Sequence, residues 1–257
     1  MKIRVFEAMV LGTVLVFGVV GCNHLPGKPG VRSETLRPEQ VLDFALLYKN
    51  SCSACHGDHG LNGAALPLDN PVYLAWAGHD RMVQIVAGGM SHTLMPAFAE
   101  SRGGTLTDQQ VESIVSGMID HWGKPGILNG TNAPGYTHVA QGDGTQGKAA
   151  FQTFCARCHG TDGKGISGSD AETKSVLARS KTGPFVGSIV DPTYLSLVSN
   201  QELRDIVVSG LPGGGMPDWR GDGVVKPMTD KDVSDIVAWL VSQRVQFPGQ
   251  PLSTSQQ

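Results

Sequence analysis

The chain has 257 residues, of which 34 are glycine and 15 are proline, and it carries a formal net charge of −3. That length allows two domains of about 100 residues each, and the mild acidity gives no reason to propose a nucleic acid as a partner. Aromatic residues make up only 6%, which is thin for two conventional cores, so a bound apolar group is expected to help fill them.

The first residues are typical of an export signal. Lys2 and Arg4 precede an apolar run from Val10 to Val20, which is shorter than the about 20 residues of a comfortable membrane span. The run ends in Val19-Val20-Gly21-Cys22, which resembles a bacterial lipobox. The resemblance implies cleavage before Cys22, lipidation of its thiol, and a lipid-anchored location on the periplasmic side of a bacterial membrane. An uncleaved anchor helix and an ordinary signal peptide are the alternatives.

A polar segment rich in proline and glycine follows the signal. We assign residues 1–21 to the signal peptide and 22–36 to a tether. Apolar residues then recur at helical spacing, which predicts a helix over Glu39–Asn50 with Pro38 in its first turn.

The same kind of pentapeptide occurs twice, as Cys52-Ser53-Ala54-Cys55-His56 and as Cys155-Ala156-Arg157-Cys158-His159. C-x-x-C-H is the attachment motif of a c-type haem. The two thiols bind one porphyrin covalently, and the histidine supplies an axial ligand to its iron. A redox dithiol or half of a zinc site is the alternative reading of C-x-x-C, and the adjacent histidine in both copies argues against it. The five cysteines are then assigned to two haem c groups (Cys52, Cys55, Cys155 and Cys158) and to the lipid (Cys22).

An internal repeat extends beyond the two motifs. Asn70-Pro71-Val72-Tyr73-Leu74 matches Asp191-Pro192-Thr193-Tyr194-Leu195, and the register then holds without a gap to Met95-Pro96 and Met216-Pro217. Two closing helices also correspond, with one added residue in the second copy. The second copy carries 18 extra residues within 161–190, which we predict to be a surface loop rich in glycine and serine.

This order of helix, C-x-x-C-H, long loop, short helix, Met-Pro and closing helix resembles the class I cytochrome c fold, present twice. The resemblance implies a mainly α protein with two small helical domains, each wrapped around a covalent haem. It places these domains at 37–123 and 143–247, with a linker over 124–142 and a flexible tail over 248–257.

Met95 and Met216 are the expected sixth iron ligands, opposite His56 and His159. A thioether is a soft ligand that raises the reduction potential of the iron. The alternative for any methionine on a loop is core packing, and the equal register of the two copies argues against it.

Two other residues could ligate the first iron. Met90 falls opposite Leu211 in the repeat, so we predict that it packs in the core, whereas His92 lies only three residues before Met95 and would lower the potential. The remaining histidines near the domains are expected at the surface or in loops: His59, His79, His121 and His138.

The repeat also predicts two structural details. Pro67 and Pro184 are candidates for the carbonyls that accept a hydrogen bond from the proximal histidines, with ordinary loop prolines as the alternative. Where the first and last helices cross, Phe44 should face Gly117 in the first copy, and Gly147 should face Trp239 in the second.

Two irons capped on both sides would have no open position for a substrate. The leading hypothesis is therefore a membrane-tethered dihaem electron carrier without catalytic residues of its own. It would pass single electrons between respiratory or photosynthetic partners, namely a quinol-oxidising complex, a terminal oxidase or a reaction centre, or act as a fixed subunit of such a complex. The alternatives are a peroxidase-like dihaem oxidoreductase with one open haem site, and a docking subunit whose second haem is structural.

Overall fold

The structure is a computed structural model that describes residues 36–91, 93–137, 141–179, 183, 185–223 and 225–245. The export signal, Cys22 and the tail over 248–257 lie outside the described residues and stay predictions. The chain divides into a short unit that ends at Gln40 and a larger unit that begins at Val41. Within its described part, the short unit contains the 3₁₀ turn η2 (Pro38–Gln40). Both copies of the repeat lie in the larger unit.

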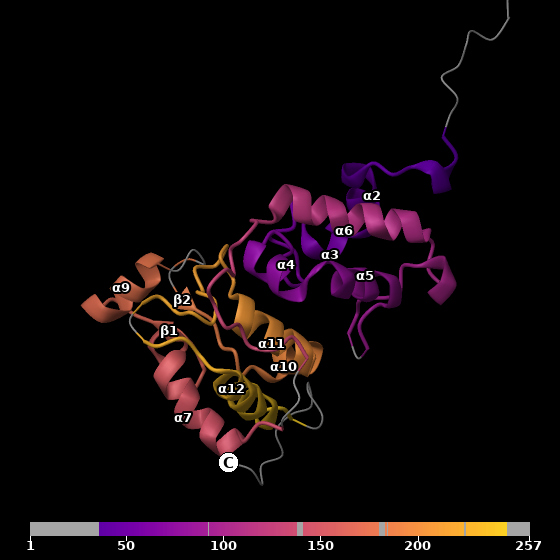
Figure 1. Cartoon of the computed structure of the whole chain (residues 1–257). Coiled ribbons are helices and arrows are strands. Elements are labelled where there is room, and N and C mark those ends of the chain that lie inside the picture. Colours follow the sequence, from indigo (N-terminus) through magenta and orange to yellow (C-terminus); the bar gives the residue numbers. More distant parts are fainter. Residues whose placement is uncertain are drawn as a thin grey trace, which may run out of the picture. The chain divides into compact units, whose positions relative to one another are not determined.

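The first copy consists of helices joined by loops (Figure 1). Its core includes Leu74, Ile114 and Val115, all of which are almost completely buried. The elements, in chain order, are α2 (Phe44–Ser51), α3 (Ser53–His56), α4 (Pro71–Ala77), α5 (His79–Gly88), the turn η3 (Glu100–Arg102) and the closing helix α6 (Asp108–Trp122).

The predicted helix over 39–50 begins later than expected, at Phe44. The reason is Asp43, whose side chain accepts a hydrogen bond from the backbone N–H of Leu46 at 2.8 Å. Asp43 is therefore an N-cap with extended backbone, and a helix cannot continue through such a residue.

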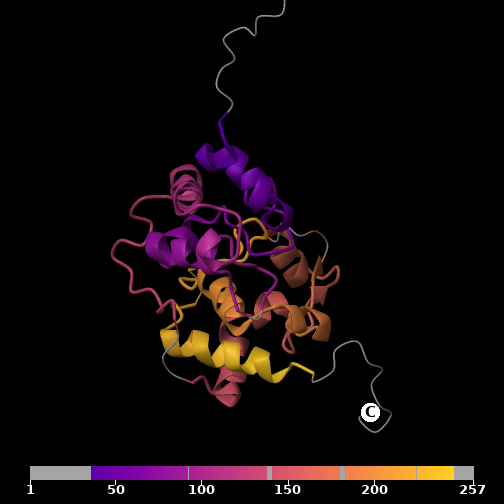
Figure 2. The ribbon, with the colours of Figure 1, turned by 90° about the vertical axis from the view of Figure 1, so that its right-hand side faces the viewer.

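The second copy repeats this arrangement. Its closing helix lies across its first helix in both views (Figures 1 and 2), and the core between them includes Phe151, Leu195 and Trp219. The corresponding elements are α7 (Gly144–Phe154), α8 (Ala156–His159), α10 (Pro192–Leu197), α11 (Asn200–Ser209) and α12 (Asp230–Ser242). Helices predominate, as the sequence predicts, and no helix among the described residues is long and apolar enough to cross a membrane.

The extra segment of the second copy is not simply a loop, so that prediction was wrong. It forms a two-stranded antiparallel ladder, β1 (Ile166–Ser167) with β2 (Phe185–Val186), and the helix α9 (Ala171–Arg179) between them. Asp170 explains where α9 begins, because its side chain accepts from the N–H of Thr173 at 2.9 Å. The glycines and serines of the segment lie mainly on either side of this helix, and they masked its helix-forming run.

Both closing helices begin with the same device. Thr107 and Gln110 form a capping box at the start of α6, and Thr229 and Asp232 form one at the start of α12. Each box satisfies two backbone N–H groups that the helix itself cannot satisfy. The matched start fixes the two closing helices at equivalent places in the two copies.

The predicted helix crossings are confirmed. A β-carbon on Gly117 would lie 2.3 Å from Cδ2 of Phe44, and one on Gly147 would lie 2.8 Å from Cβ of Trp239. In the second copy the rings of Phe151 and Trp239 then pack against each other in a tilted arrangement, with their centroids 4.3 Å apart. Only glycine allows the backbones to come this close, so the sequence dictates where the helices touch.

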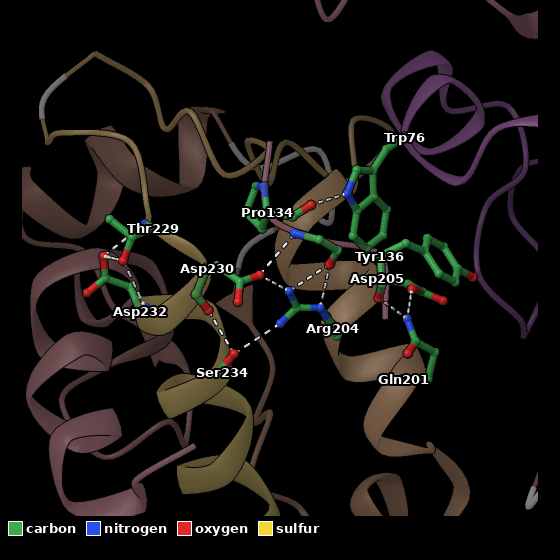
Figure 3. A network of polar contacts seen from close by, with 11 residues as sticks. Trp76, Pro134, Tyr136, Gln201, Arg204, Asp205, Thr229, Asp230, Asp232 and Ser234 are labelled. Carbon is green, nitrogen blue, oxygen red and sulfur yellow. Dashed lines mark hydrogen bonds and ion pairs between the residues drawn. The ribbon is translucent and has the colours of Figure 1, made fainter. Parts of the chain in front are cut away.

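The segment between the copies is held by buried polar groups (Figure 3). Arg204 of α11, only 3% exposed, donates to the Gly135 carbonyl at 2.7 and 2.9 Å and pairs with Asp230. Trp76 of α4 donates from Nε1 to the Pro134 carbonyl at 2.6 Å. Residues 134 and 135 therefore connect a helix of the first copy with two helices of the second.

Candidate haem-binding sites

The first C-x-x-C-H motif lies on a tight helical corner between α2 and α3. The N–H of Cys52 donates to the Tyr48 carbonyl at 2.8 Å, and the N–H of His56 donates to the Cys52 carbonyl at 3.0 Å. Cys52 is half-buried, Cys55 is exposed, and neither forms a disulfide. Burial, and secondarily the neighbouring Cys55, raises the pKa of Cys52 to about 12. A redox dithiol needs a thiolate of low pKa, so this environment does not favour that alternative.

His56 is held as a neutral ligand by its surroundings. Its Nδ1 is 2.8 Å from the Leu66 carbonyl, and burial lowers the pKa of the imidazole. A neutral ring that donates from Nδ1 carries a free lone pair on Nε2, which is the state that a metal ligand requires. The expected acceptor was Pro67, which is wrong by one residue. The residue before a proline is restricted to extended backbone, so it is the Leu66 carbonyl that is fixed in place.

The second motif has the same local geometry, between α7 and α8. The N–H of Cys155 donates to the Phe151 carbonyl at 2.8 Å, and that of His159 donates to the Cys155 carbonyl at 3.0 Å. Burial, and secondarily Cys158, raises the pKa of Cys155 to about 12. Burial also lowers the pKa of His159, so this imidazole is neutral as well.

His159 differs from His56 in one respect. Its Nδ1 is buried and has no hydrogen-bond partner among the described residues. The predicted acceptor, Pro184, lies outside the described residues, so that prediction stays untested. A buried imidazole nitrogen without a partner is costly in an ordinary core, so the Nδ1 of His159 calls for an acceptor like the one that His56 has.

The two Met-Pro segments share one backbone frame. The N–H of Met90 donates to the Met95 carbonyl at 3.1 Å, and the N–H of Leu211 donates to the Met216 carbonyl at 3.0 Å. Met90 therefore occupies the place of Leu211, as the repeat predicts. Met95 and Met216 are both half-buried at the same point of their loops. Their equivalence extends from the sequence register to the hydrogen bonds.

A glycine begins each of these loops in a left-handed conformation. Gly89 has a φ of 69° and Gly210 has a φ of 67°. A β-carbon at either position would lie 2.6 Å from the carbonyl carbon of the proline that follows the methionine, Pro96 or Pro217. Each loop is therefore closed tightly upon its own start, which fixes the methionine backbone.

The other histidines give no competing ligand set among the residues described. His79 pairs with Glu112 at 2.8 Å, His121 stacks on Phe44 at 5.0 Å, and His59 is exposed. His92 and His138 lie outside the described residues. Within the described ranges, no group of three or more His, Cys, Asp or Glu side chains could hold a metal ion.

The donor set fits haem c in both copies. Each offers two unpaired thiols, a neutral buried imidazole directly after the second thiol, and a loop methionine in the same frame. A family model described as cytochrome C oxidase, cbb3-type, subunit III matches residues 39–116 and 142–240. The chain belongs to this family. It is accordingly a c-type cytochrome with tandem cytochrome c domains, and the family implies covalently bound haem c.

Several curated proteins of this family are similar to the chain. The Cbb3-type cytochrome c oxidase subunit FixP of Sinorhizobium medicae (strain WSM419) is 29% identical over 209 residues, which are 70% of this chain and 65% of that protein. FixP of Rhizobium meliloti (strain 1021) is 30% identical over 146 residues, 51% of this chain and 45% of that protein. The subunit CcoP of Rubrivivax gelatinosus is 30% identical over 130 residues, 50% of this chain and 37% of that protein. The chain thus spans less than two thirds of each of these relatives.

Proposed function

We propose that the chain carries two haem c groups and passes single electrons to a terminal oxidase of the cbb3 type. The first haem would be attached through Cys52 and Cys55, and the second through Cys155 and Cys158. The equal helical corner at each motif supports this assignment. The terminal oxidase as partner is supported by the similarity to the cbb3-type oxidase subunits FixP and CcoP.

The axial ligands in this proposal are His56 and Met95 for the first haem, and His159 and Met216 for the second. The Leu66 carbonyl would hold the ring of His56 and increase its basicity. When bound, haem c supplies the one-electron Fe(III)/Fe(II) couple on which the function depends. The chain would contribute the fixed imidazole, the fixed thioether and the apolar surroundings, which together keep water away from the ligands.

The observation that carries the proposal is one backbone hydrogen bond that the two methionine loops share. A peroxidase-like oxidoreductase needs one haem with an open or exchangeable sixth position, and such a site would be expected to differ between the copies at the methionine. Instead, the same N–H to carbonyl bond closes both loops, at 3.1 Å in the first and 3.0 Å in the second. Two equally closed centres favour electron transfer over substrate chemistry.

The remaining elements of the proposal concern the location of the protein. Lipidation of Cys22 would tether it to the periplasmic side of a bacterial membrane, where electrons could come from a quinol-oxidising complex. A reaction centre is a further partner of the same chemical kind. Labelling of the expressed protein with a fatty acid analogue, compared between the native chain and Cys22→Ser, tests the anchor directly.

The central test uses the full chain expressed with cytochrome c maturation. A pyridine haemochrome assay should give two haems per chain, and the reduced wild-type protein should not bind carbon monoxide. Met95→Ala and Met216→Ala should each open one haem to carbon monoxide. One haem per chain, or carbon monoxide binding that neither exchange alters, would overturn the assignment.

A further inference from the structure

Asn70 makes contacts that neither haem motif explains. It is the N-cap of α4 and is completely buried. Its Oδ1 accepts from the N–H groups of Val72 and Tyr73 at 3.1 and 3.2 Å. Its Nδ2 donates across to the second copy, to the carbonyls of Ser209 and Gly210, at 3.2 Å each. The amide thus satisfies the start of one helix and the end of another.

The two carbonyls that Asn70 binds lie at the start of the second methionine loop. Ser209 is the last residue of α11, and Gly210 is its C-cap. Leu211 then pairs with Met216 through two backbone hydrogen bonds, of 3.0 and 3.2 Å. Because the loop is closed tightly upon Gly210, a shift of Gly210 would move Met216 with it.

Asn70 itself is fixed by the loop that follows the first motif. The N–H groups of Leu68 and Asp69, which directly precede it, donate to the Gly60 carbonyl at 2.8 and 3.1 Å. The Leu66 carbonyl of the same loop accepts from His56. The loops also meet at a second point, because a β-carbon on Gly213 would lie 3.7 Å from Cδ2 of Leu61.

The equivalent residue in the second copy cannot make this connection. Asp191 caps α10 in the same way, accepting from the N–H of Tyr194 at 2.9 Å. It is exposed, and a carboxylate has no hydrogen to donate. Either residue can therefore cap a helix. Only the amide of Asn70 can also donate hydrogen bonds to the other copy.

We propose that Asn70 is a positioning residue for the second centre, which holds the loop of Met216 against the loop that follows the first C-x-x-C-H motif and binds the ring of His56. This inference rests on the proposed function, because it takes Met216 as an iron ligand. The orientation of the second methionine is then set partly by the first copy, and the two centres are coupled through a pair of hydrogen bonds.

The test uses the haem-loaded full chain with Asn70→Ser, and with Asp191→Asn as the matched control. Serine remains a good N-cap, but its side chain is too short to reach α11. Hydrogen exchange at the amides of Leu211 and Met216 should become about tenfold faster or more in Asn70→Ser, because two buried hydrogen bonds are lost. Exchange within α5 and α6 should not change, and Asp191→Asn should leave residues 211–216 as in the wild type.

A second readout follows the ligand itself. Asn70→Ser should let carbon monoxide bind at a fraction of the second haem and none of the first. Asn70→Asp, with the same shape, should show the same local change if Asn70→Ser does not fold. Unchanged exchange over 211–216 in the folded variant, or an equal increase across the whole chain, would overturn the inference. Wild-type protein that already binds carbon monoxide would instead contradict the proposed function.

Discussion

At the crossing of the first and closing helices, the two copies place the large ring and the glycine on opposite partners. In the first copy Phe44 of α2 faces Gly117 of α6, whereas in the second Gly147 of α7 faces Trp239 of α12. The comparison indicates that the fold requires a constant total volume at this point and is indifferent to which helix supplies it. The two glycines also touch different groups: Gly117 contacts the side chain of Phe44, whereas Gly147 contacts the backbone of Asp235.

The copies differ again in their buried polar groups. In the described part of the first copy, Asn70 and Gln110 are the buried polar side chains. The second copy buries a larger set: Arg204, Asp205, Ser209, Ser234 and Asp235. Of these, Arg204 donates to the Gly135 carbonyl, and Asp235 accepts from the N–H of Asp143, the N-cap of α7. The first copy is thus a more apolar domain, and the second carries most of the polar connections.

The largest effect is expected from Gly147→Ala. The new β-carbon would lie 1.9 Å from the Asp235 carbonyl oxygen of α12, and backbone cannot move away without separating the helices. We expect a loss of about 3 kcal/mol or more in the free energy of unfolding, measured by denaturant titration of the haem-loaded protein. A loss well below that would contradict the tight backbone contact.

Gly117→Ala is the matched change in the first copy and should cost less, about 1–3 kcal/mol. Its β-carbon would lie 2.3 Å from the ring of Phe44. This obstacle is a side chain and not backbone, so a smaller residue at position 44 can remove it. The double variant Phe44→Leu with Gly117→Ala should recover more than half of the loss. Equal damage from the two glycine exchanges, without relief by Phe44→Leu, would disprove the volume exchange.

A pH-dependent effect on the free energy of unfolding is expected from the buried carboxyl of Asp205, which is 1% exposed. Burial raises its pKa from 3.8 to about 7, although Gln201 donates to it at 2.8 Å. The native state therefore holds this proton more strongly than the unfolded state. The resulting stabilisation is complete below about pH 4 and is lost as the pH rises through about 7.

Asp205→Asn should remove that part of the pH dependence. Relative to the wild type, the variant should become more stable as the pH rises from 4 to 8, by up to about 4 kcal/mol, because each unit of pKa difference corresponds to about 1.4 kcal/mol. The measurement is the free energy of unfolding across this range for both proteins. Parallel curves would show that the pKa of Asp205 is the same in the native and unfolded states.

The smallest effect concerns the closing helices, where the copies should behave alike. Thr107→Ala and Thr229→Ala each remove the N-cap of a capping box. Each should cost about 1 kcal/mol, as a shift of the unfolding midpoint. A marked difference between the two would mean that the equivalence of α6 and α12 does not extend to their energetics.

Most of the correct predictions about the fold came from local sequence patterns. The register of the repeat gave the closing helices and the crossings at Gly117 and Gly147, because both depend on spacing along the chain. The start of α2 was missed because Asp43 acts through one hydrogen bond, to the N–H of Leu46. The helix α9 was missed because neighbouring glycines and serines dominated the composition of its segment.

Long-range contacts could not be predicted from one sequence. Asn70 and Asp191 align as two helix caps, and nothing in the alignment says that only Asn70 reaches the carbonyl of Gly210. Likewise, Asp205 resembles any acidic residue on a helix until the fold buries it. Such contacts join residues more than about 60 positions apart, and periodicity contains no information about them.

The most direct measurement is the near-infrared absorption of the fully oxidised wild-type protein, scaled to the haem content of the same sample. A thioether bound to ferric haem gives a weak charge-transfer band there. We expect two haems per chain and a band intensity that corresponds to a methionine ligand on both haem irons. A band that corresponds to one haem, or none, with water or histidine in the sixth position, would contradict it.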